Sequence, residues 1–438
     1  MDVTARLAAF ATGPIEAPED VRRAVRLSLL DWLACGRAGT GERVARLARG
    51  LALDEGGAAR ATMFGGGRVT ARAAALVNGA TSHALDYDDT HFLHIGHPSV
   101  VVASAALATA EAEGANGAAV LDALLAGLEA ACRVGDWLGR GHYEIGFHQT
   151  GTSGAFGATV AAGRLMGLDA GAMGHALGLA STRAAGLKNQ FGTDGKPLNA
   201  GFAAEVGVSC ATLARLGATS APAGIEGRQG FGATHAGAAR DAALDGLGEA
   251  WVFPAISWKF HACCHGLHAM LEALREVRAS PGEVTAVRVT THPRWLDVCD
   301  QPAPTTGLGA KFSYRLTAAM ALSGVDTAAL ASFTDAVARR PDLTALRDRV
   351  RVATDPGLAD TAARVEVETA DGRIRRAAHD LAAPPDLAHS EARLREKAAS
   401  LVGGPEAERL WQAVAGLAAA PGLAALARTL APHEAALA

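Results

Sequence analysis

The hydrophobic residues of the first part of the chain recur at intervals of three and four positions. Val21, Val25, Leu29, Trp32 and Leu33 fall on one face of a helix at this spacing. The same period continues to about residue 270 in segments rich in alanine and glycine, whose small side chains let helix axes approach closely. This pattern predicts a large bundle of helices. The clearest segments are 99–113, 117–135, 150–166 and 200–216.

A different pattern begins after residue 276, where apolar and polar residues alternate. Such alternation is typical of strands with one buried face, and the pair Asp371-Gly372 after the last of them signals a turn. We therefore expect one small sheet in this part of the chain. Its predicted strands are 283–291, 349–353 and 364–369.

Helical periodicity returns between these strands and again after them, which is an α+β arrangement followed by further helices. We therefore expect a mainly α protein in which both chain ends, 1–256 and 391–438, form one large helical domain. A smaller α+β domain is expected to be inserted between them at 257–390. The predicted helices of the later part are 313–322, 327–338 and 391–430.

The composition agrees with a large globular protein and argues against nucleic acid as a partner. The chain has 438 residues, of which 49% are hydrophobic, so it can bury a sizeable core and two domains are the natural expectation. Its 41 Lys and Arg residues against 45 Asp and Glu residues give a net charge of -4. No basic run interleaved with aromatic residues is present, so the electrostatic signature of a nucleic-acid binder is missing.

The sequence also indicates a cytoplasmic location and no membrane association. The first apolar stretch is short and is broken by Gly13-Pro14, which does not fit a secretory signal. Later apolar stretches are interrupted by charge well before the roughly 20 residues that a membrane-spanning helix needs. Six cysteines are scattered without the spacing of a disulfide framework, which suits a reducing compartment.

The densest polar cluster of the first half is 83–99, between two predicted helices. Loops held by rigid helices often carry binding groups. Asp86 could act as a general base or orient one, and His97 could contact a carboxylate or shuttle a proton near neutral pH. The structural alternative is that Ser99 caps the following helix and that the aspartates only satisfy backbone donors.

Two further loops carry charged or titratable side chains. In 141–151, His148 falls near a helix N-terminus, which lowers the pKa of an imidazole and suits an anionic ligand. Alternatively, His148 is a helix-start residue bonded to backbone. In 188–198, Lys188 and Lys196 could clamp a carboxylate as point charges, or could simply be solvated.

A fourth cluster, 257–268, combines histidines and cysteines at helix-like spacing. Zinc is disfavoured there because no spaced Cys-x-x-Cys pair or His-Glu-x-x-His motif accompanies it. The adjacent Cys263 and Cys264 also point in different directions on most backbones. The glycine runs fit neither a dinucleotide nor a Walker pattern, and no G-x-S-x-G elbow of a serine hydrolase is present.

Taken together and in this order, the four clusters resemble the MmgE/PrpD family, which includes 2-methylcitrate dehydratase, cis-aconitate decarboxylase and iminodisuccinate epimerase. The resemblance spans about residues 5 to 430, and its most specific parts are 78–99 and 146–164. Further matches are Lys196-Pro197 and Ala310-Lys311-Phe312-Ser313.

This resemblance implies a large helical domain with a smaller α+β lid, a homodimer, and an active site in the interdomain cleft that needs no metal or organic cofactor. His265 and His268 could be additional substrate contacts, or core histidines that satisfy backbone groups. By matching position, the residues implied to line the site are Asp86, Thr90, His97, His148, Lys196 and Lys259.

The resemblance implies an enzyme of the lyase class. We expect a cofactor-independent hydro-lyase, similar to 2-methylcitrate dehydratase, that abstracts a proton next to a carboxylate of a small di- or tricarboxylate. Loss of this proton requires cations directed at the developing enediolate. The expected carboxylate holders are Lys196, Lys259 and His97, and the expected proton-transfer pair is His148 with Asp86.

Departures from the family pattern keep two other functions open. Leu316 stands where family lyases often carry tyrosine, and Gln149 stands where proline commonly follows the loop histidine. Leu316 puts decarboxylation in doubt and favours an epimerase or isomerase, which removes and returns the same kind of proton without losing a group. A third possibility, from another class, is an inactive polycarboxylate-binding protein.

Overall fold

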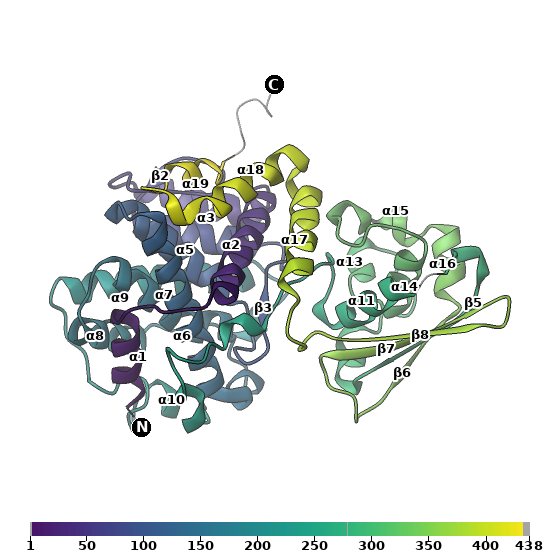
Figure 1. Cartoon of the computed structure of the whole chain (residues 1–438), viewed down its shortest axis with the longest axis horizontal. Coiled ribbons are helices and arrows are strands. Elements are labelled where there is room, and N and C mark those ends of the chain that lie inside the picture. Colours follow the sequence, from purple (N-terminus) through teal and green to yellow (C-terminus); the bar gives the residue numbers. More distant parts are fainter. Residues whose placement is uncertain (1, 278, 432–438) are drawn as a thin grey trace. The chain divides into compact units, whose positions relative to one another are not determined.

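The computed structural model describes residues 2–277 and 279–431. The protein is mainly α, as the hydrophobic periodicity predicted. It divides into two compact units (Figure 1), of which the first comprises Met1–Trp258 with Pro385–Ala438 and the second comprises Lys259–Pro384. Among the described residues, no helix combines the length and the apolar character needed to cross a membrane.

The first unit consists of helices joined by loops and two pairs of very short strands. Its helices before the second unit are α1 (Val3–Thr12), α2 (Glu19–Gly39), α3 (Arg43–Glu55), α4 (Ala71–Ser82), α5 (Pro98–Glu113), α6 (Gly117–Glu144), α7 (Gln149–Leu165), α8 (Ala170–Ala180), α9 (Gly195–Arg215) and α10 (Phe231–Thr234). Its helices after the second unit are α17 (Leu387–Val402), α18 (Gly404–Ala415) and α19 (Ala424–Arg428). Its strands are β1 (Ala61–Thr62), β2 (Arg68–Val69), β3 (Thr90–His91) and β4 (Ile256–Ser257).

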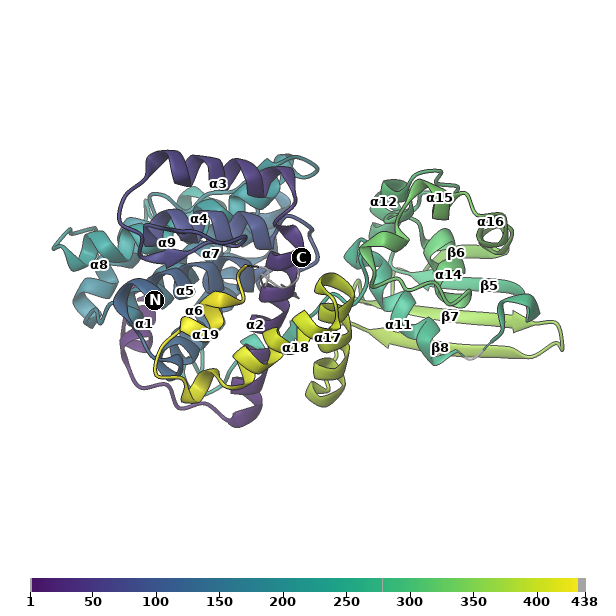
Figure 2. The same cartoon turned by 90° about the horizontal axis from the view of Figure 1, so that it is seen from above.

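Small residues allow the central helices of this unit to pack closely. A Cβ atom on Gly79 of α4 would lie 2.9 Å from the Cα atom of Gly201 on α9. Similarly, a Cβ atom on Gly157 of α7 would lie 2.5 Å from the carbonyl oxygen of Gly127 on α6. In Figure 2, α4, α9 and α7 lie one beside another. Glycine at these contacts lets the backbones approach, which is the packing that the alanine- and glycine-rich segments predicted.

The chain returns to the first unit through α17, which lies along α2 (Figure 1). On α17, the buried Lys397 forms two polar contacts with the rest of the unit. Its Nζ atom donates to Oδ1 of Asp31 on α2 at 2.5 Å and to the carbonyl oxygen of Tyr87 at 2.6 Å. Because Tyr87 belongs to the loop between α4 and α5, this lysine connects the end of the chain to that loop.

The second unit contains the predicted sheet, in the strand order β6 (Val350–Thr354), β5 (Val284–Thr291), β7 (Ala362–Thr369), β8 (Ile374–Asp380). Strand β5 is parallel to β6 and antiparallel to β7, with Val287 opposite Val367 and Val289 opposite Val365. These four valines are buried. The helices of this unit are α11 (His268–Glu276), α12 (Leu296–Cys299), α13 (Gly307–Ala310), α14 (Tyr314–Leu322), α15 (Asp335–Ala338) and α16 (Pro341–Arg347).

The structure corrects the predicted secondary structure at two places. The helix predicted at 327–338 is wrong, because the range holds a 3-10 helix at Leu330–Ser332 and the short α15, whose separate start is capped by the Thr334 side chain. The return to helix predicted at 391–430 is confirmed, as several helices separated at Gly403 and Gly416. Strand β8 was not predicted, because its side chains are exposed or half-buried and show no apolar alternation.

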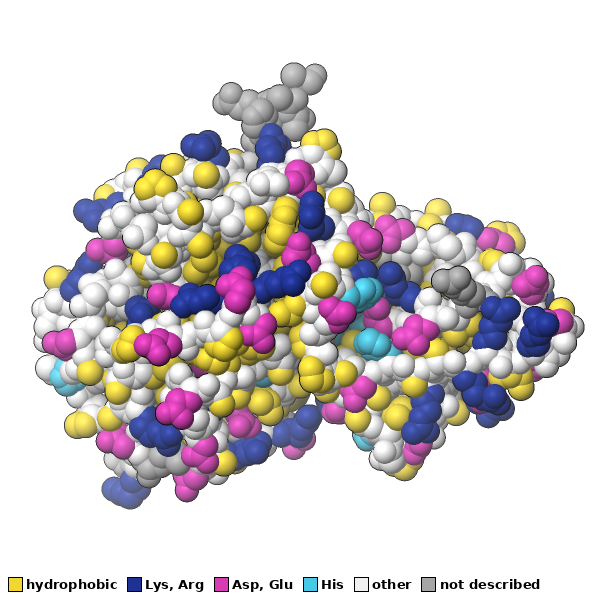
Figure 3. Space-filling model, in the orientation of Figure 1, with side chains coloured by type: hydrophobic (Ala, Val, Ile, Leu, Met, Phe, Trp, Pro, Cys, Tyr) yellow, Lys and Arg dark blue, Asp and Glu magenta, His cyan; other side chains and the backbone are white. Residues whose placement is uncertain are grey.

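Charged side chains of both signs are interspersed on the surface. On the face of the described residues that Figure 3 shows, the dark blue and magenta side chains alternate over both units. A surface of mixed sign gives no continuous positive field for a polyanion, in agreement with the composition.

We predict that replacing Lys397 by methionine destabilises the helical unit by about 3 kcal/mol, because the buried Asp31 carboxylate then loses its partner. Urea unfolding followed by circular dichroism measures this change. The matched control is Arg23→Met, which breaks the more exposed pair of Arg23 with Glu391 between the same two helices and should cost less than about 1 kcal/mol. Equal losses in the two variants would contradict the role assigned to Lys397.

Candidate active site

The candidate site is built around the loop between α4 and α5. His83 is the C-terminal cap of α4, and His97 is the N-terminal cap of α5, which begins with Pro98. Between them, Asp86 has a φ of 51°, in the left-handed region that aspartate tolerates better than most residues. The tight turn brings both ends of the loop together, so that two histidines and two aspartates of this segment meet.

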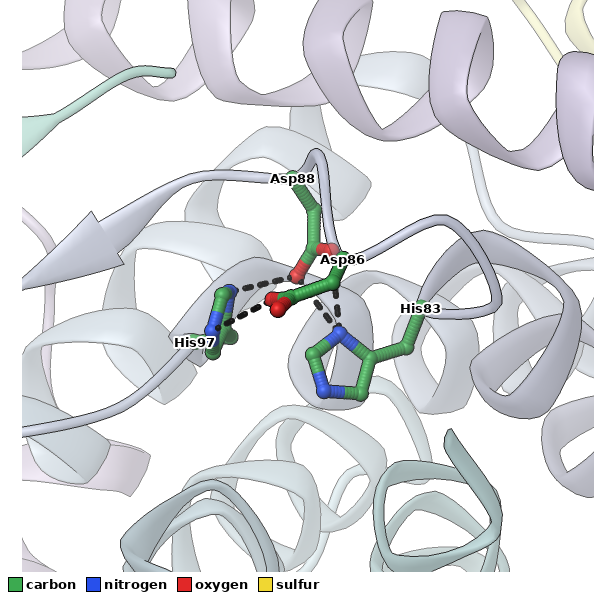
Figure 4. A group of neighbouring side chains, drawn as sticks. All are labelled: His83, Asp86, Asp88 and His97. Atoms are coloured by element: carbon green, nitrogen blue, oxygen red, sulfur yellow. Dashed lines mark hydrogen bonds and ion pairs between the residues drawn. The ribbon is translucent and has the colours of Figure 1, made fainter. Parts of the chain in front are cut away.

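Asp88 lies between the two imidazole rings (Figure 4). The Nδ1 atom of His83 lies 2.9 and 3.0 Å from its two carboxylate oxygens, and the Nδ1 atom of His97 lies 2.8 Å from Oδ2. All three side chains are almost fully buried. Burial by itself would raise the pKa of Asp88, but the two rings outweigh it and hold that pKa well below its usual range. Asp88 is therefore an ionised carboxylate that orients both rings.

The orientation of His83 and His97 follows from this shared acceptor. Burial lowers the pKa of His97 to about 4, against the opposing effect of Asp88, so the ring is neutral near pH 7. With Nδ1 of each ring directed at Asp88, the Nε2 atom is the one that faces away. The Nε2 atom of His83 is buried without a hydrogen-bond partner among the described residues.

Two more buried carboxylates, those of Asp89 and Asp31, lie in or next to this loop. Oδ2 of Asp89 accepts a hydrogen bond from the Ser99 hydroxyl at 2.6 Å. Ser99 therefore does not cap α5, and the structural alternative considered for it is wrong. Burial, together with the nearby Asp31, raises the pKa of Asp89 to about 7, and burial raises the pKa of Asp31 to about 6 although Lys397 opposes the shift.

Lys196 reaches the same loop from the first turn of α9. Its Nζ atom lies 2.6 Å from Oδ2 of Asp86, whose Oδ1 atom is 3.4 Å from Nε2 of His97. The Asp86 side chain is 47% exposed, whereas that of Lys196 is 15% exposed. Asp86 is thus the most accessible group of the cluster, and it already faces a lysine ammonium group.

His148 lies on the other side of His83 and is the N-terminal cap of α7. The two rings are stacked with centroids 6.1 Å apart, and the ring of Phe191 meets His148 edge-on at 4.9 Å. Burial, with His83, Lys196 and His97 nearby, lowers the pKa of His148 well below its usual value. Its ring nitrogen Nδ1 is bonded to the side chain of Asn199 rather than to backbone. His148 is therefore a neutral imidazole at the edge of this cluster of charged and titratable groups.

The remaining predicted residue of the first unit, Thr90, lies in β3. It is paired with Ser257 of β4, and its hydroxyl donates to the Ser257 carbonyl oxygen at 3.3 Å. Lys188, the other lysine of its loop, donates to the carbonyl oxygen of Tyr143 at 3.0 Å and lies over that aromatic ring. Lys196 is therefore the lysine of that loop that reaches the histidine and aspartate cluster.

Lys259 and His265 belong to the second unit, so their approach to the first-unit cluster stays a prediction. Lys259 comes two residues after Ser257, the strand partner of Thr90. His265 begins a short 3-10 helix and packs its ring edge-on against that of His268 at 5.0 Å. His268 is buried and donates from Nε2 to the Cys263 carbonyl oxygen at 3.3 Å, as a core histidine does.

Three residues of the cluster had no role in the sequence-based prediction, namely His83, Asp88 and Asn199. His83 and Asp88 lie in the segment that the sequence singled out, and a histidine five positions before an aspartate in a loop was the available signal. Asn199 gave no signal, because it is an ordinary helix residue that reaches His148 only through the packing of α9 against α7.

The ligand atoms of four side chains lie within 4.8 Å of one another, and two imidazoles with two carboxylates are a set that can hold a divalent cation. The four residues are His83, Asp86, Asp88 and His97. The contacts of these four side chains favour ion pairs and hydrogen bonds within the protein over binding of a metal ion. The Lys196 ammonium group already lies against Asp86, and both Nδ1 atoms are directed at Asp88 rather than at a common centre.

The sequence of this chain matches two domains of one protein family. Residues 5–242 match the MmgE/PrpD N-terminal domain, and residues 261–418 match the MmgE/PrpD C-terminal domain. The chain therefore belongs to the MmgE/PrpD family, which confirms the resemblance of its four clusters.

Similar proteins with curated names are cis-aconitate decarboxylases. The cis-aconitate decarboxylase-like protein oryM of Aspergillus oryzae is 30% identical over 298 residues, which are 63% of this chain and 62% of that protein. The cis-aconitate decarboxylase of Aspergillus terreus is 29% identical over 60% of this chain and 57% of its own length. The human cis-aconitate decarboxylase is 30% identical over 49% of this chain and 46% of its own length. The chain thus spans less than two thirds of the length of these relatives.

We predict that Asp89→Asn changes how stability depends on pH. The folded protein holds the Asp89 proton up to about pH 7, whereas the unfolded chain releases it near the ordinary value of 3.8. Between these values the folded state binds more protons, so the free energy of unfolding falls as pH rises. The variant lacks this titration and should gain stability relative to the parent protein as pH rises toward about 7.

Urea midpoints from about pH 5 to about pH 8 measure this difference. The control is Asp136→Asn, at a partly exposed carboxylate that pairs with Arg240. A stability difference between Asp89→Asn and the parent protein that stays constant with pH would show that Asp89 is ionised throughout.

Proposed function

We propose that this protein is a cofactor-independent lyase that removes a proton next to a carboxylate of a small di- or tricarboxylate, in the manner of 2-methylcitrate dehydratase. The observation that carries this proposal is the convergence of Asp86, Lys196, His97 and His148 in one cluster of the helical unit. An accessible carboxylate beside an ammonium group and two imidazoles combines a proton acceptor with groups that bind anions. The relatives named cis-aconitate decarboxylase support a tricarboxylate as the substrate.

In this proposal, Lys196, Lys259 and His97 hold the substrate carboxylates, and Thr90 and His265 add hydrogen bonds. A substrate with two or three negative charges requires several cationic or donor groups in a partly buried site. His97 is neutral in the unliganded protein, and a carboxylate at its Nε2 atom would favour the imidazolium form, which Asp88 stabilises from the other side.

Asp86 is the proposed base. In the unliganded protein its carboxylate is paired with Lys196, and a substrate carboxylate that binds Lys196 would weaken this pair. Asp86 would then be left beside the substrate carbon with its proton-accepting capacity restored. His148 completes the proposed proton-transfer pair from the other side, where its ring can donate a hydrogen bond to the charge that develops on the substrate.

The second candidate function is epimerisation, and the surroundings of Leu316 favour it. Leu316 is a buried leucine and has no phenol that could protonate a leaving group. The nearby Tyr314 does not substitute for it, because its hydroxyl donates to the Gly266 carbonyl oxygen at 2.6 Å inside the second unit. Epimerisation loses no group, so it needs no donor for a leaving group, and the proton that returns to the opposite face of the carbon would come from another acid of the site.

We further propose that the protein acts as a homodimer in the cytoplasm. Several large apolar side chains of the helical unit are about half exposed, which is expected where a second copy covers them. They include Leu47 and Leu51 on α3 and Phe202 on α9. No disulfide forms among the cysteines of the described residues, which fits a reducing compartment. Light scattering should give twice the mass of one chain, and a monomer at working concentration would contradict the proposal.

We predict turnover by chelator-treated protein without added metal. Purified protein would be offered 2-methylcitrate, citrate, cis-aconitate and iminodisuccinate, with alkene absorbance and proton NMR in deuterium oxide as the readouts. A new or consumed conjugated alkene identifies a lyase. Deuterium exchange into the substrate without an alkene identifies the epimerase. Tight substrate binding with neither reaction would leave only the binding-protein alternative.

Variants test the proposed roles in the same assay. Asp86→Asn should lower kcat by about 100-fold or more, because the amide cannot accept the proton. Lys196→Met should mainly raise KM, because it removes a carboxylate holder. The control is His175→Gln, a histidine of α8 that accepts a hydrogen bond from the Ser220 amide and should leave both constants unchanged. Unchanged turnover in His148→Ala would remove His148 from the mechanism.

A further inference from the structure

The side chain of Asn199 connects His148 to the neighbouring loop. Its Nδ2 atom lies 3.1 Å from Nδ1 of His148 and 3.3 Å from the carbonyl oxygen of Leu187. Asn199 and His148 are both buried, so water does not compete for these bonds. The amide nitrogen of Asn199 thus lies between two groups that must share its two hydrogens.

The orientation of this amide follows from the Leu187 carbonyl oxygen, which can only accept hydrogen bonds. The opposite orientation of Asn199 would place its own carbonyl oxygen against that of Leu187. The NH2 group therefore faces both neighbours and donates one hydrogen to each of them. It follows that Nδ1 of His148 is an acceptor and carries no proton.

The backbone fixes the distance between these partners. The His148 amide donates to the Gly186 carbonyl oxygen at 3.0 Å, and the Lys188 amide donates to the Gly146 carbonyl oxygen at 2.8 Å. Phe147 and Leu187 form an antiparallel bridge between these two bonds. The Leu187 carbonyl group therefore cannot move away from the ring of His148, and Asn199 spans a gap of fixed width.

A neutral imidazole with an unprotonated Nδ1 atom carries its proton on Nε2. Formation of the imidazolium ion would add a proton to Nδ1 and set it against the NH2 group of Asn199, with two donors face to face. The contact with Asn199 therefore disfavours both the other neutral tautomer and the charged form of His148.

We propose that Asn199 is a positioning residue that locks His148 in the Nε2–H tautomer, so that His148 acts as a hydrogen-bond donor to the developing enediolate and not as a base. The inference rests on the proposed function and deepens it, because it assigns proton abstraction to Asp86 alone. Removal of one such donor typically costs about 100- to 1000-fold in kcat.

The tautomer can be observed without any substrate. Protein labelled with 15N in histidine would be studied by long-range proton–nitrogen correlation NMR near pH 7, with the His148 signals assigned from the spectrum of His148→Gln. We expect an unprotonated Nδ1 and a protonated Nε2 in the parent protein. In Asn199→Asp, whose carboxylate only accepts, the proton should move to Nδ1.

The kinetic test uses the same variants. Asn199→Asp and Asn199→Ala should lower kcat by about 100-fold or more, with a much smaller change in KM. Both variants should melt below the parent, because the Leu187 carbonyl oxygen loses its donor, and circular dichroism checks that each is folded at the assay temperature. The control is Asn116→Asp, which makes the same charge change at the N-terminal cap of α6, where aspartate caps equally well. Its kcat should be unchanged.

The outcomes separate this inference from the proposed function. A protonated Nδ1 in the parent protein overturns the tautomer assignment even if turnover is found. A tautomer that switches in Asn199→Asp with unchanged kcat overturns the donor role of His148. If the parent protein shows the expected tautomer but no turnover on any substrate, the proposed lyase fails while the positioning of His148 by Asn199 stands.

Discussion

A carboxylate shared between two imidazoles holds the candidate site in its shape. Asp88 is buried, accepts a hydrogen bond from Nδ1 of His83 and lies 2.8 Å from Nδ1 of His97, and these two histidines are the two ends of the loop. A buried charge is tolerated only when it is paired and hydrogen-bonded, so the loop cannot open without exposing Asp88 or leaving it unpaired. The positions of Asp86 and of the ring nitrogens that face away from Asp88 depend on this one contact.

The surrounding helices supply what this loop cannot provide by itself. Lys397 enters from the far end of the chain and binds the Tyr87 carbonyl group, while Lys196 enters from α9 and faces Asp86. The two lysines differ in burial, and we assign them different roles for this reason. Lys397 is enclosed and structural, whereas Lys196 lies beside the half-exposed Asp86 and can exchange one carboxylate partner for another.

His148 shows how a side chain's chemistry depends on a neighbour rather than on its own position. At the N-terminus of α7 it could serve as a base, an acid or a donor. Burial, with the Lys196 ammonium group nearby, lowers its pKa and keeps it neutral, and Asn199 determines which nitrogen carries the proton. The division of roles between Asp86 and His148 in the proposed reaction therefore originates in a helix residue that touches neither end of the reacting loop.

The sequence by itself determined the mainly α class, the small sheet and the family, because periodicity and local motifs are properties of neighbouring residues. It also singled out Asp86, His97, His148 and Lys196. The tertiary structure alone decided which of these residues meet and which other side chains support them. Asn199, which binds His148, and Lys397, which binds the Tyr87 carbonyl group, both come from helices distant in sequence. It likewise created β8, whose exposed side chains carry no periodic signal and which forms only because β7 offers it an edge.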